Sequence, residues 1–389
     1  MRVLHVIPAV APRYGGPSHA VVGMGRALPH QGVGVLIATT DADGPTRLPV
    51  ERGAQLSWQG IPAIFFPRQW SEAFKYSRLL ATYLDRHVGD FDVVHIHAVF
   101  SHACLAAAGA CQRSGVPYVV RPLGTLDPWS LRQKPLRKQL LWHVGVRRML
   151  QGAAAIHYTT AAERRLAESP LGLHDGVVIP LGVDAELFAG PLEDNGVLER
   201  DQPFGSQPYI LVLGRLHPKK GLELLLDAFM QLASSAPYRH WRLVIAGDGD
   251  AQYVASLKQL IRRLGGDDKV HMVGWLGGHA KVAALRGAAL LVLVSQQENF
   301  GLVVAEALAC GTPVLVSTEV NLADEIRAAE AGWVVPLEPT ALLETLAYAL
   351  GHDDERVRRG RAGCALARAR FTWPGVAAEL ASLYRAVAR

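Results

Sequence analysis

Two carboxylates, Glu298 and Glu306, lie on a predicted loop and on the helix that follows it. The run 290–295 is apolar throughout, as in a buried parallel strand, and the predicted helix 301–310 is apolar except for Glu306. A carboxylate on a buried helix is unfavourable unless a partner satisfies it. Two interpretations therefore stand: a structural ion pair in the core, or a ligand-binding carboxylate at the end of a strand, where α/β sheets present their ligands.

Two cations, Arg215 and Lys220, flank a second predicted strand-to-helix turn, between a strand at 209–214 and a helix at 222–235. The N-terminus of a helix repels cations, so a pair gathered there is best explained by an anion shared between them, such as a diphosphate. Two solvated surface side chains are the alternative.

The turn after the first predicted strand, residues 2–7, contains Gly15 and Gly16. Glycines at such a turn let the backbone approach a ligand closely, although an ordinary turn would also use them. Gly23 and Gly25 lie inside the following helix and form no dinucleotide fingerprint, so we expect neither NAD nor another cofactor.

The segment from Glu298 to Glu306 resembles the E-x7-E signature of the family-four retaining glycosyltransferases, which have the GT-B fold. The resemblance implies that Glu306 holds the ribose of a nucleotide-sugar donor and that Glu298 contacts the donor sugar. It also implies that Arg215 and Lys220 bind the donor pyrophosphate and stabilise it as the leaving group. The other implied donor-binding residues are Gly15, Gly16, Asn299, Phe300, Gly301 and Leu302.

The fold expected from this resemblance is α/β, with two Rossmann-like domains whose parallel sheets face a cleft. The predicted boundaries are 1–185 for an N-terminal acceptor domain, 186–207 for a linker, 208–370 for a nucleotide-sugar-binding domain, and 371–389 for a helix that returns to the first domain. Residues 177–184 resemble the family motif at the domain junction, with Leu181 in place of an asparagine.

The first domain departs from the family where a histidine usually follows the strand that ends at Val120. This chain has Arg121 there, as in a variant found in bacterial exopolysaccharide and O-antigen transferases. His97, at the end of the preceding strand, and His102 are the substitutes. We therefore assign His97 and Arg121 to the acceptor side.

Composition excludes several classes of protein. The 389 residues are 50% hydrophobic, enough for two domains, and no run is long and uncharged enough to span a membrane. Four cysteines without C-x-x-C spacing suit a reducing cytoplasm. Two D-x-D pairs, beginning at Asp41 and Asp248, lie in turn-forming contexts, so we predict no metal site.

Positive charge is concentrated in one segment. Residues 121–150 contain seven basic residues and one acidic residue, whereas the whole chain carries only +5. Within 131–150 the basic residues alternate with Leu, Val and Trp at helical spacing. Three interpretations remain: a helix packed on the core with a solvated face, a surface that docks on anionic lipid, or a nucleic-acid surface, for which no recognition module is visible.

The sequence thus predicts a retaining, metal-independent glycosyltransferase. It would move a sugar from a nucleotide-diphosphate sugar to a glycan acceptor, lipid-linked, in cell-surface polysaccharide synthesis. It would work in the cytoplasm, in part at the membrane face, without nucleic acid. The alternatives are a nucleotide-sugar epimerase or hydrolase on the same fold, and a non-catalytic nucleotide-sugar-binding protein.

Overall fold

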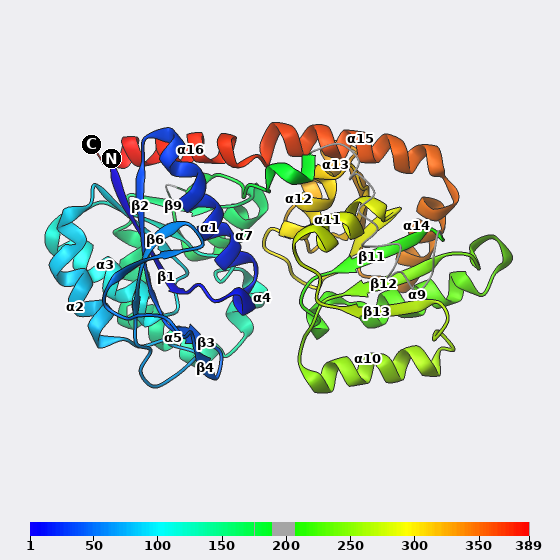
Figure 1. The fold of residues 1–389 in the computed structure, drawn as a ribbon, viewed down its shortest axis with the longest axis horizontal. Helices are drawn as coiled ribbons and strands as arrows, with labels where there is room; N and C mark the ends of the chain where they lie inside the picture. Colours follow the sequence, from blue (N-terminus) through cyan, green and yellow to red (C-terminus); the bar gives the residue numbers. More distant parts are fainter. Residues whose placement is uncertain (175, 189–206, 389) are drawn as a thin grey trace. The chain divides into compact units, whose positions relative to one another are not determined.

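The computed structural model describes residues 1–174, 176–188 and 207–388, and it divides into two compact units. Unit 1 comprises Met1–Gly182 and Trp373–Arg389, and unit 2 comprises Val183–Thr372. Most of the predicted linker 186–207 lies outside the described residues. Each unit is an α/β domain built on a parallel sheet, so the predicted fold class is confirmed (Figure 1).

The sheet of unit 1 has the strand order β10-β9-β8-β7-β1-β2-β6-β5 and is parallel except for β5. Its strands are β1 (Arg2–Ala9), β2 (Gly34–Thr40), β5 (Gln55–Trp58), β6 (Ile61–Phe66), β7 (Val93–His97), β8 (Tyr118–Arg121), β9 (Ala155–Tyr158) and β10 (Gly176–Val178), and a small hairpin, β3 (Ala42–Asp43) and β4 (Thr46–Arg47), follows β2. The central strands are buried on both faces, which explains their continuous apolar runs.

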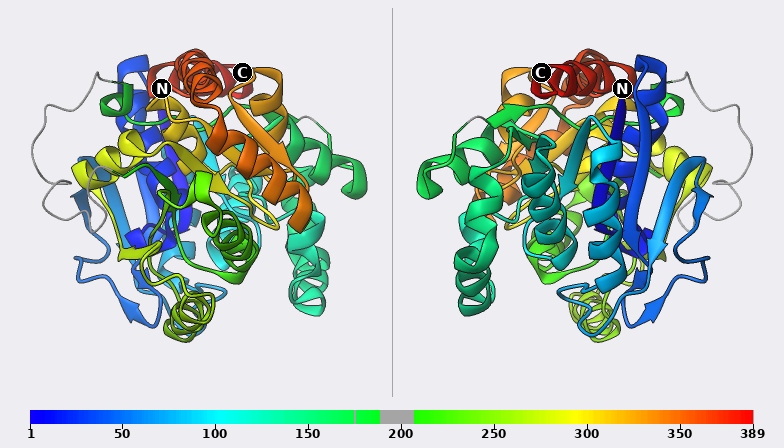
Figure 2. Two further views of the ribbon diagram at one scale, coloured as in Figure 1. Left: turned by 90° about the vertical axis from the view of Figure 1, so that its right-hand side faces the viewer. Right: turned by 90° about the vertical axis from the view of Figure 1, so that its left-hand side faces the viewer.

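Helices cover both faces of this sheet. The helices of unit 1 are α1 (Gly16–Ala27), α2 (Arg78–His87), α3 (His102–Ser114), α4 (Pro128–Arg132), α5 (Pro135–Leu141), α6 (Arg147–Gln151), α7 (Ala161–Leu171) and α16 (Trp373–Val387). In Figure 2, α2 and α3 lie on one face, in cyan. On the other face α16 packs against α1, where the Trp373 ring fills the place that a side chain at Gly23 would need. The glycines inside α1 therefore serve helix packing.

The basic segment 131–150 does not form the single helix that its helical spacing suggested. It is a broken helical segment at the edge of unit 1, visible in both views of Figure 2. Gln133 and Lys134 separate α4 from α5, with Lys134 at a φ of +53° and Pro135 as the first residue of α5. A π-helical turn, Trp142–Val146, joins α5 to α6. Val146 and Leu150 pack in the core, whereas Leu136, Leu140 and Val144 are 82%, 64% and 69% exposed. Leu141 and Trp142, in the middle of the segment, also pack against the core, so only the part before Leu141 lacks core packing.

Unit 2 has an all-parallel sheet with the order β13-β12-β11-β14-β15-β16. The strands are β11 (Tyr209–Leu213), β12 (Arg242–Ala246), β13 (Val270–Gly274), β14 (Leu290–Leu293), β15 (Val314–Ser317) and β16 (Gly332–Val335), and the helices are α9 (Leu222–Ala233), α10 (Ala251–Arg263), α11 (Gly278–Gly287), α12 (Leu302–Ala309), α13 (Ala323–Ala328), α14 (Pro339–Gly351) and α15 (Asp353–Arg370). The strand order turns back between β11 and β14. Ligands of open α/β sheets bind at such a reversal, beyond the carboxyl ends of the strands.

Candidate functional site

The loops after β11 and β14 bring the predicted donor-binding residues of unit 2 together. Lys220 ends a 3-10 turn, Pro218–Lys220, and its ammonium group contacts the Glu298 carboxylate. Gly221 makes this approach possible, because it has a φ of +66° and a side chain there would meet the Val294 carbonyl oxygen at 2.3 Å. A hollow lined by Gly214, Arg215 and Lys220 lies beside them, and Arg215 is exposed.

Glu298 is held rigidly by its backbone. Its N–H donates to the Glu319 carbonyl oxygen at 3.1 Å, and its own carbonyl oxygen accepts from the Asn321 N–H at 3.0 Å. Burial alone would raise the pKa of the Glu298 carboxyl, but the nearby cations Lys220, Lys219 and Arg215 outweigh burial and hold this pKa below its usual value. Glu298 is therefore an ionised carboxylate among cations.

Glu306 lies on α12 and pairs with a residue that the sequence did not single out. The Lys281 Nζ of α11 donates to Glu306 Oε1 at 2.7 Å, so the buried carboxylate has the partner that its burial requires. Burial raises the pKa of Glu306 in spite of this lysine. One carboxylate oxygen remains for a ligand. No spacing signal in the sequence links Lys281 to Glu306, since the contact joins two separate helices.

The residues between these carboxylates present backbone to the site. Phe300 is buried, with its ring edge-on to Phe371 at 5.6 Å, so its side chain anchors the loop in the core. Gly301 precedes the first turn of α12 with a φ of +74°. The Val304 N–H donates to the Gly301 carbonyl oxygen at 2.7 Å, so the N–H groups of Leu302 and Val303 are the ones without an acceptor in the helix. Asn299 and Leu302 are half-buried on either side. A helix N-terminus of this kind favours an anionic ligand.

In unit 1, Gly15 and Gly16 form the turn between β1 and α1, and neither has a heavy atom within 4 Å of where a side chain would begin. Gly15 has a φ of +68°, which favours glycine. The backbone of this turn is therefore open to a ligand, and its assignment to the donor stays a prediction.

His97 and Arg121 are fully buried in the same unit, with exposures of 0% and 2%. They are neighbours across β7 and β8, and an Arg121 Nη1–H donates to His97 Nδ1 at 3.5 Å. Burial lowers the pKa of the Arg121 guanidinium to about 10, which leaves it charged at neutral pH. Neither side chain reaches solvent here, and their assignment to the acceptor stays a prediction.

His97 belongs to a buried histidine layer, made of His5 on β1, His95 and His97 on β7, and His157 on β9. The Ile179 carbonyl oxygen only accepts, so His157 Nε2 carries the proton that lies 2.8 Å from it. His157 Nδ1 then accepts from His95 Nε2–H at 3.4 Å, and His95 Nδ1 accepts from the Tyr384 hydroxyl at 2.7 Å. Each ring in this chain is neutral, with one tautomer.

The proton positions on His97 and His5, the other two rings of the histidine layer, follow from Arg121, because a guanidinium group only donates hydrogen bonds. His97 Nδ1 accepts from Arg121, so His97 Nε2–H donates to His5 Nδ1 at 3.0 Å. Ring nitrogens of His5, His95 and His97 lie within 4.8 Å of one another, a spacing that metal ligands also show. The adjacent Arg121 cation and the direct bond between two rings favour a neutral hydrogen-bonded layer instead.

Glu163, which the sequence analysis did not single out, fixes the loop that follows Arg121. Its carboxylate accepts from the Gly124 N–H at 2.7 Å, from the Thr159 N–H at 2.7 Å and from the Thr159 hydroxyl at 2.8 Å. Burial raises the pKa of this carboxyl, and these donors oppose the shift.

The carboxylates of both D-x-D pairs have protein partners. Asp41 is fully buried and accepts from Arg52 Nε and from the Arg68 N–H, both at 2.7 Å. Asp250 caps α10 by accepting from the Gln252 and Tyr253 N–H groups. Asp250 therefore has the local turn role that the sequence predicted, whereas the partners of Asp41 lie 11 and 27 residues further along the chain.

Two family models match this chain. A glycosyl transferase 4-like domain matches residues 15–182, and glycosyl transferases group 1 matches residues 198–364. The chain belongs to the family-four glycosyltransferases. The predicted family is thereby confirmed, and the activity follows in its general form: this glycosyltransferase transfers a sugar from a nucleotide sugar.

Relatives of this glycosyltransferase are similar over most of their length. A D-inositol 3-phosphate glycosyltransferase from Jonesia denitrificans is 28% identical, covering 99% of this chain and 95% of the relative. A phosphatidyl-myo-inositol mannosyltransferase from Mycobacterium tuberculosis is 29% identical over 77% of this chain and 75% of its own.

Solved structures share the fold. HepE from Anabaena, in complex with UDP-glucose, has a TM-score of 0.80 at 21% identity, with 99% of this chain and 100% of HepE covered. Sucrose-phosphate synthase from Thermosynechococcus elongatus has a TM-score of 0.80 at 20% identity, with 99% and 98% covered. This likeness confirms the predicted GT-B fold.

Proposed function

We propose that this glycosyltransferase retains the anomeric configuration, needs no divalent metal, and extends a lipid-linked glycan acceptor in cell-surface polysaccharide synthesis, at the cytoplasmic face of the membrane. The observation that carries the donor half is the pair of lysine-partnered carboxylates in unit 2, Lys220 with Glu298 and Lys281 with Glu306. Both carboxylates lie beyond the carboxyl end of β14, where a nucleotide sugar fits an open α/β sheet. Retention and the acceptor class rest on the family resemblance.

Arg215 and Lys220 would stabilise the departing diphosphate in place of a metal ion. They offer two positive charges beside the N-terminus of α12, and charge-assisted hydrogen bonds from such groups stabilise a developing anion. The two units would divide the substrates, with the nucleotide sugar on unit 2 and the acceptor on unit 1. The names of relatives contain inositol 3-phosphate, sucrose phosphate and phosphatidyl-myo-inositol, so an acceptor that carries a phosphate group fits this proposal.

A panel of nucleotide sugars, scored by thermal shift in buffer with excess chelator, tests the donor half. Ligand at about 100 times its Kd stabilises the folded state by about 2.7 kcal/mol, so a true donor should raise Tm by several degrees. The double substitution Arg215→Met and Lys220→Met should abolish the shift, whereas Arg262→Met and Arg263→Met, on the exposed side of α10, should keep it. A shift that appears only when magnesium or manganese is added would contradict metal independence.

Docking on an anionic bilayer is proposed for the face of α5 and the turn after it. Leu136, Leu140 and Val144 are spaced by one helical turn and exposed together. Arg147 and Arg148, on the next helix, are exposed beside them, which complements lipid phosphate in charge. No described helix is long and apolar enough to cross a bilayer. An apolar stripe flanked by cations is typical of a helix that lies in the membrane surface.

Flotation with vesicles of phosphatidylglycerol and phosphatidylcholine tests this docking. Each basic residue near an anionic surface contributes about 1 kcal/mol, and burial of one leucine contributes about 1.5–3 kcal/mol. We therefore expect Leu136→Ser with Leu140→Ser to lower the bound fraction at least about ten-fold, and salt to weaken binding of the wild type. As a control, Arg262→Gln with Arg263→Gln removes two exposed charges from α10, outside the proposed docking face, and should leave the bound fraction unchanged. Binding that is insensitive to lipid charge, salt and both leucines would contradict docking at this face.

A further inference from the structure

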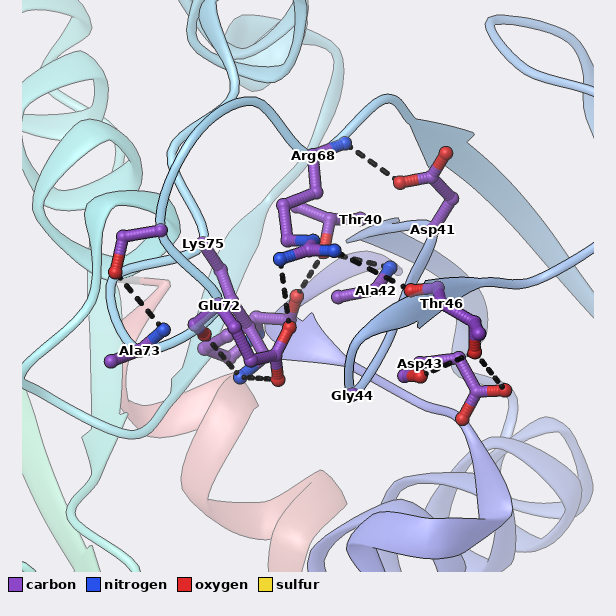
Figure 3. A network of polar contacts seen from close by, with 12 residues as sticks. Thr40, Asp41, Ala42, Asp43, Gly44, Thr46, Arg68, Glu72, Ala73 and Lys75 are labelled. Atoms are coloured by element: carbon purple, nitrogen blue, oxygen red, sulfur yellow. Dashed lines mark hydrogen bonds and ion pairs between the residues drawn. The ribbon is translucent and has the colours of Figure 1, made fainter.

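Loops from the carboxyl ends of three neighbouring strands of unit 1 meet around Glu72, and the loops after β1 and β6 supply the groups that contact its carboxylate. Tyr14 follows β1, while Arg68, Glu72 and Lys75 follow β6 and lie over the segment after β2 (Figure 3). We call Tyr14, Arg68, Glu72 and Lys75 the Glu72 cluster. The carboxyl ends of parallel strands are where α/β sheets bind their ligands, and no step of the donor site uses this cluster.

Three donors converge on the Glu72 carboxylate. The Tyr14 hydroxyl donates to Oε1 at 2.5 Å, Lys75 Nζ lies 3.0 Å from Oε1, and Arg68 Nη1 lies 3.3 Å from Oε2. The side chains of Arg68 and Lys75 are 10% and 15% exposed, whereas that of Glu72 is 35% exposed. The cations therefore lie deeper than the anion they hold, and a second anion arriving from solvent would meet the same donors.

Arg68 has spare donor capacity at this place. The residue is 9% exposed, and its Nε has no hydrogen-bond partner among the described residues. The rest of the residue is fixed, because its N–H donates to Asp41 Oδ1 at 2.7 Å and its Nη2 lies 3.5 Å from the Thr46 carbonyl oxygen. A buried donor without an acceptor is unfavourable and points to a missing partner.

The loop that carries the cluster is also strained. Trp70 and Lys75 have φ values of +57° and +50°, a region that side chains other than glycine rarely adopt. Such strain is retained where the surrounding structure needs one particular geometry. Lys75 Nζ also lies 4.7 Å above the centre of the Tyr14 ring, which ties this loop to the turn that contains Gly15.

We propose that the Glu72 cluster binds the phosphate or diphosphate group of the acceptor, and that Glu72 is an internal anion which the acceptor displaces. Two cations and one hydroxyl donor face a single carboxylate, so replacing Glu72 by a doubly charged phosphate improves the charge balance. Burial and the bond to Glu72 raise the pKa of Tyr14 to about 12, so its hydroxyl stays a donor at neutral pH. The inference rests on the proposed division of substrates, with the acceptor on unit 1.

Inorganic pyrophosphate, titrated by calorimetry, is the probe. The titration uses the full chain carrying Arg215→Met and Lys220→Met, so that pyrophosphate cannot bind at the donor site. Arg68→Met and Lys75→Met should each weaken binding about ten-fold, as expected for the loss of one charge-assisted contact, and Glu72→Gln should tighten it by a similar factor. Arg47→Met removes an exposed cation on the neighbouring hairpin and should change the affinity less than about two-fold.

The sign of the Glu72→Gln effect decides the matter. A purely structural cluster would lose order when Glu72 is neutralised, and binding would weaken or stay unchanged; either result overturns the proposal. An Arg47→Met effect as large as that of Arg68→Met would also overturn it. UDP binding to Glu72→Gln with Arg215 and Lys220 intact reports on the donor site alone, so a failure there is distinguishable from a failure here.

Three further ligands, geranyl diphosphate, glucose 6-phosphate and inorganic phosphate, identify the source of the phosphate. If the acceptor is lipid-linked, geranyl diphosphate should bind more tightly than pyrophosphate, and Leu136→Ser with Leu140→Ser should remove that gain. If it is a soluble sugar phosphate, glucose 6-phosphate should gain affinity over inorganic phosphate without any effect of the leucines. Either pattern supports the proposal if Glu72→Gln raises the affinity for the preferred ligand. If Glu72→Gln changes the affinity for none of the four ligands, the proposal is contradicted.

Discussion

Glu298→Gln should lower turnover about 100- to 1,000-fold while leaving the affinity for UDP within a few-fold of wild type. The carboxylate lies among Lys220, Lys219 and Arg215, and charge at this place matters most during transfer. Removing one negative charge beside these cations also favours an anionic ligand, so UDP affinity should stay equal or rise. Initial rates with a donor found by thermal shift, together with UDP titration, measure both quantities.

Glu306→Ala should show the opposite pattern. Its free carboxylate oxygen would accept from a ribose hydroxyl, a charge-assisted bond worth about 1.5–3 kcal/mol, so UDP affinity should fall about ten- to a hundred-fold. Glu319→Ala, on an exposed residue of the loop that bonds to the Glu298 backbone, is the matched control and should leave UDP binding unchanged. If Glu306→Ala binds UDP normally, or Glu298→Gln loses UDP as severely, the two roles are assigned wrongly.

Acid should unfold unit 1 well above the pH at which carboxylates titrate. Burial lowers the pKa of His5 and His157 to about 3 and those of His95 and His97 well below 6.5, with Arg121 adding to each shift. The unfolded chain therefore binds more protons than the folded one, and stability falls as pH drops through 6.5. Each such histidine costs about 2 kcal/mol between pH 7 and pH 5, and four together approach the stability of a whole domain.

Urea unfolding at a series of pH values, followed by near-UV circular dichroism, measures this dependence. His157→Gln keeps a donor for the Ile179 carbonyl oxygen and should reduce the slope of stability against pH by about 1.4 kcal/mol per pH unit, the contribution of one proton. His30→Gln, on an exposed histidine, is the control. Tyr384 and Glu163 are further titratable groups near the layer. Burial raises the pKa of the Tyr384 hydroxyl, so it stays protonated between pH 7 and pH 5. Burial also raises the pKa of the Glu163 carboxyl, so its effect on the slope of stability against pH has the opposite sign. A slope unchanged by His157→Gln would contradict the assignment.

The positions of β1, β11, β14 and α12 could be predicted from the sequence, because a buried parallel strand is a local run of apolar residues. β6, β9 and β16 are not among the predicted strands. The predicted helix 301–310 is observed as Leu302–Ala309, and Gly311, with a φ of +78°, follows it in the left-handed conformation. The helix that contains Gly23 and Gly25 ends at Ala27 and tightens into a 3-10 turn, Leu28–Gln31. Pro29, which cannot donate to the helix, explains that end.

The sequence by itself determined the family, the α/β fold and the need of Glu306 for a partner, because each depends on residues close together in the chain. Only the tertiary structure decided which partner each buried charge has. Lys281 reaches Glu306 from another helix, and Tyr384, from the last helix of the chain, reaches His95. It also decided that Leu136 and Leu140 face solvent and that Tyr14 donates to Glu72, 58 residues further along the chain. These contacts join segments that are far apart along the chain and meet only because helices and loops pack on the sheets. The periodicity of the sequence does not report that packing.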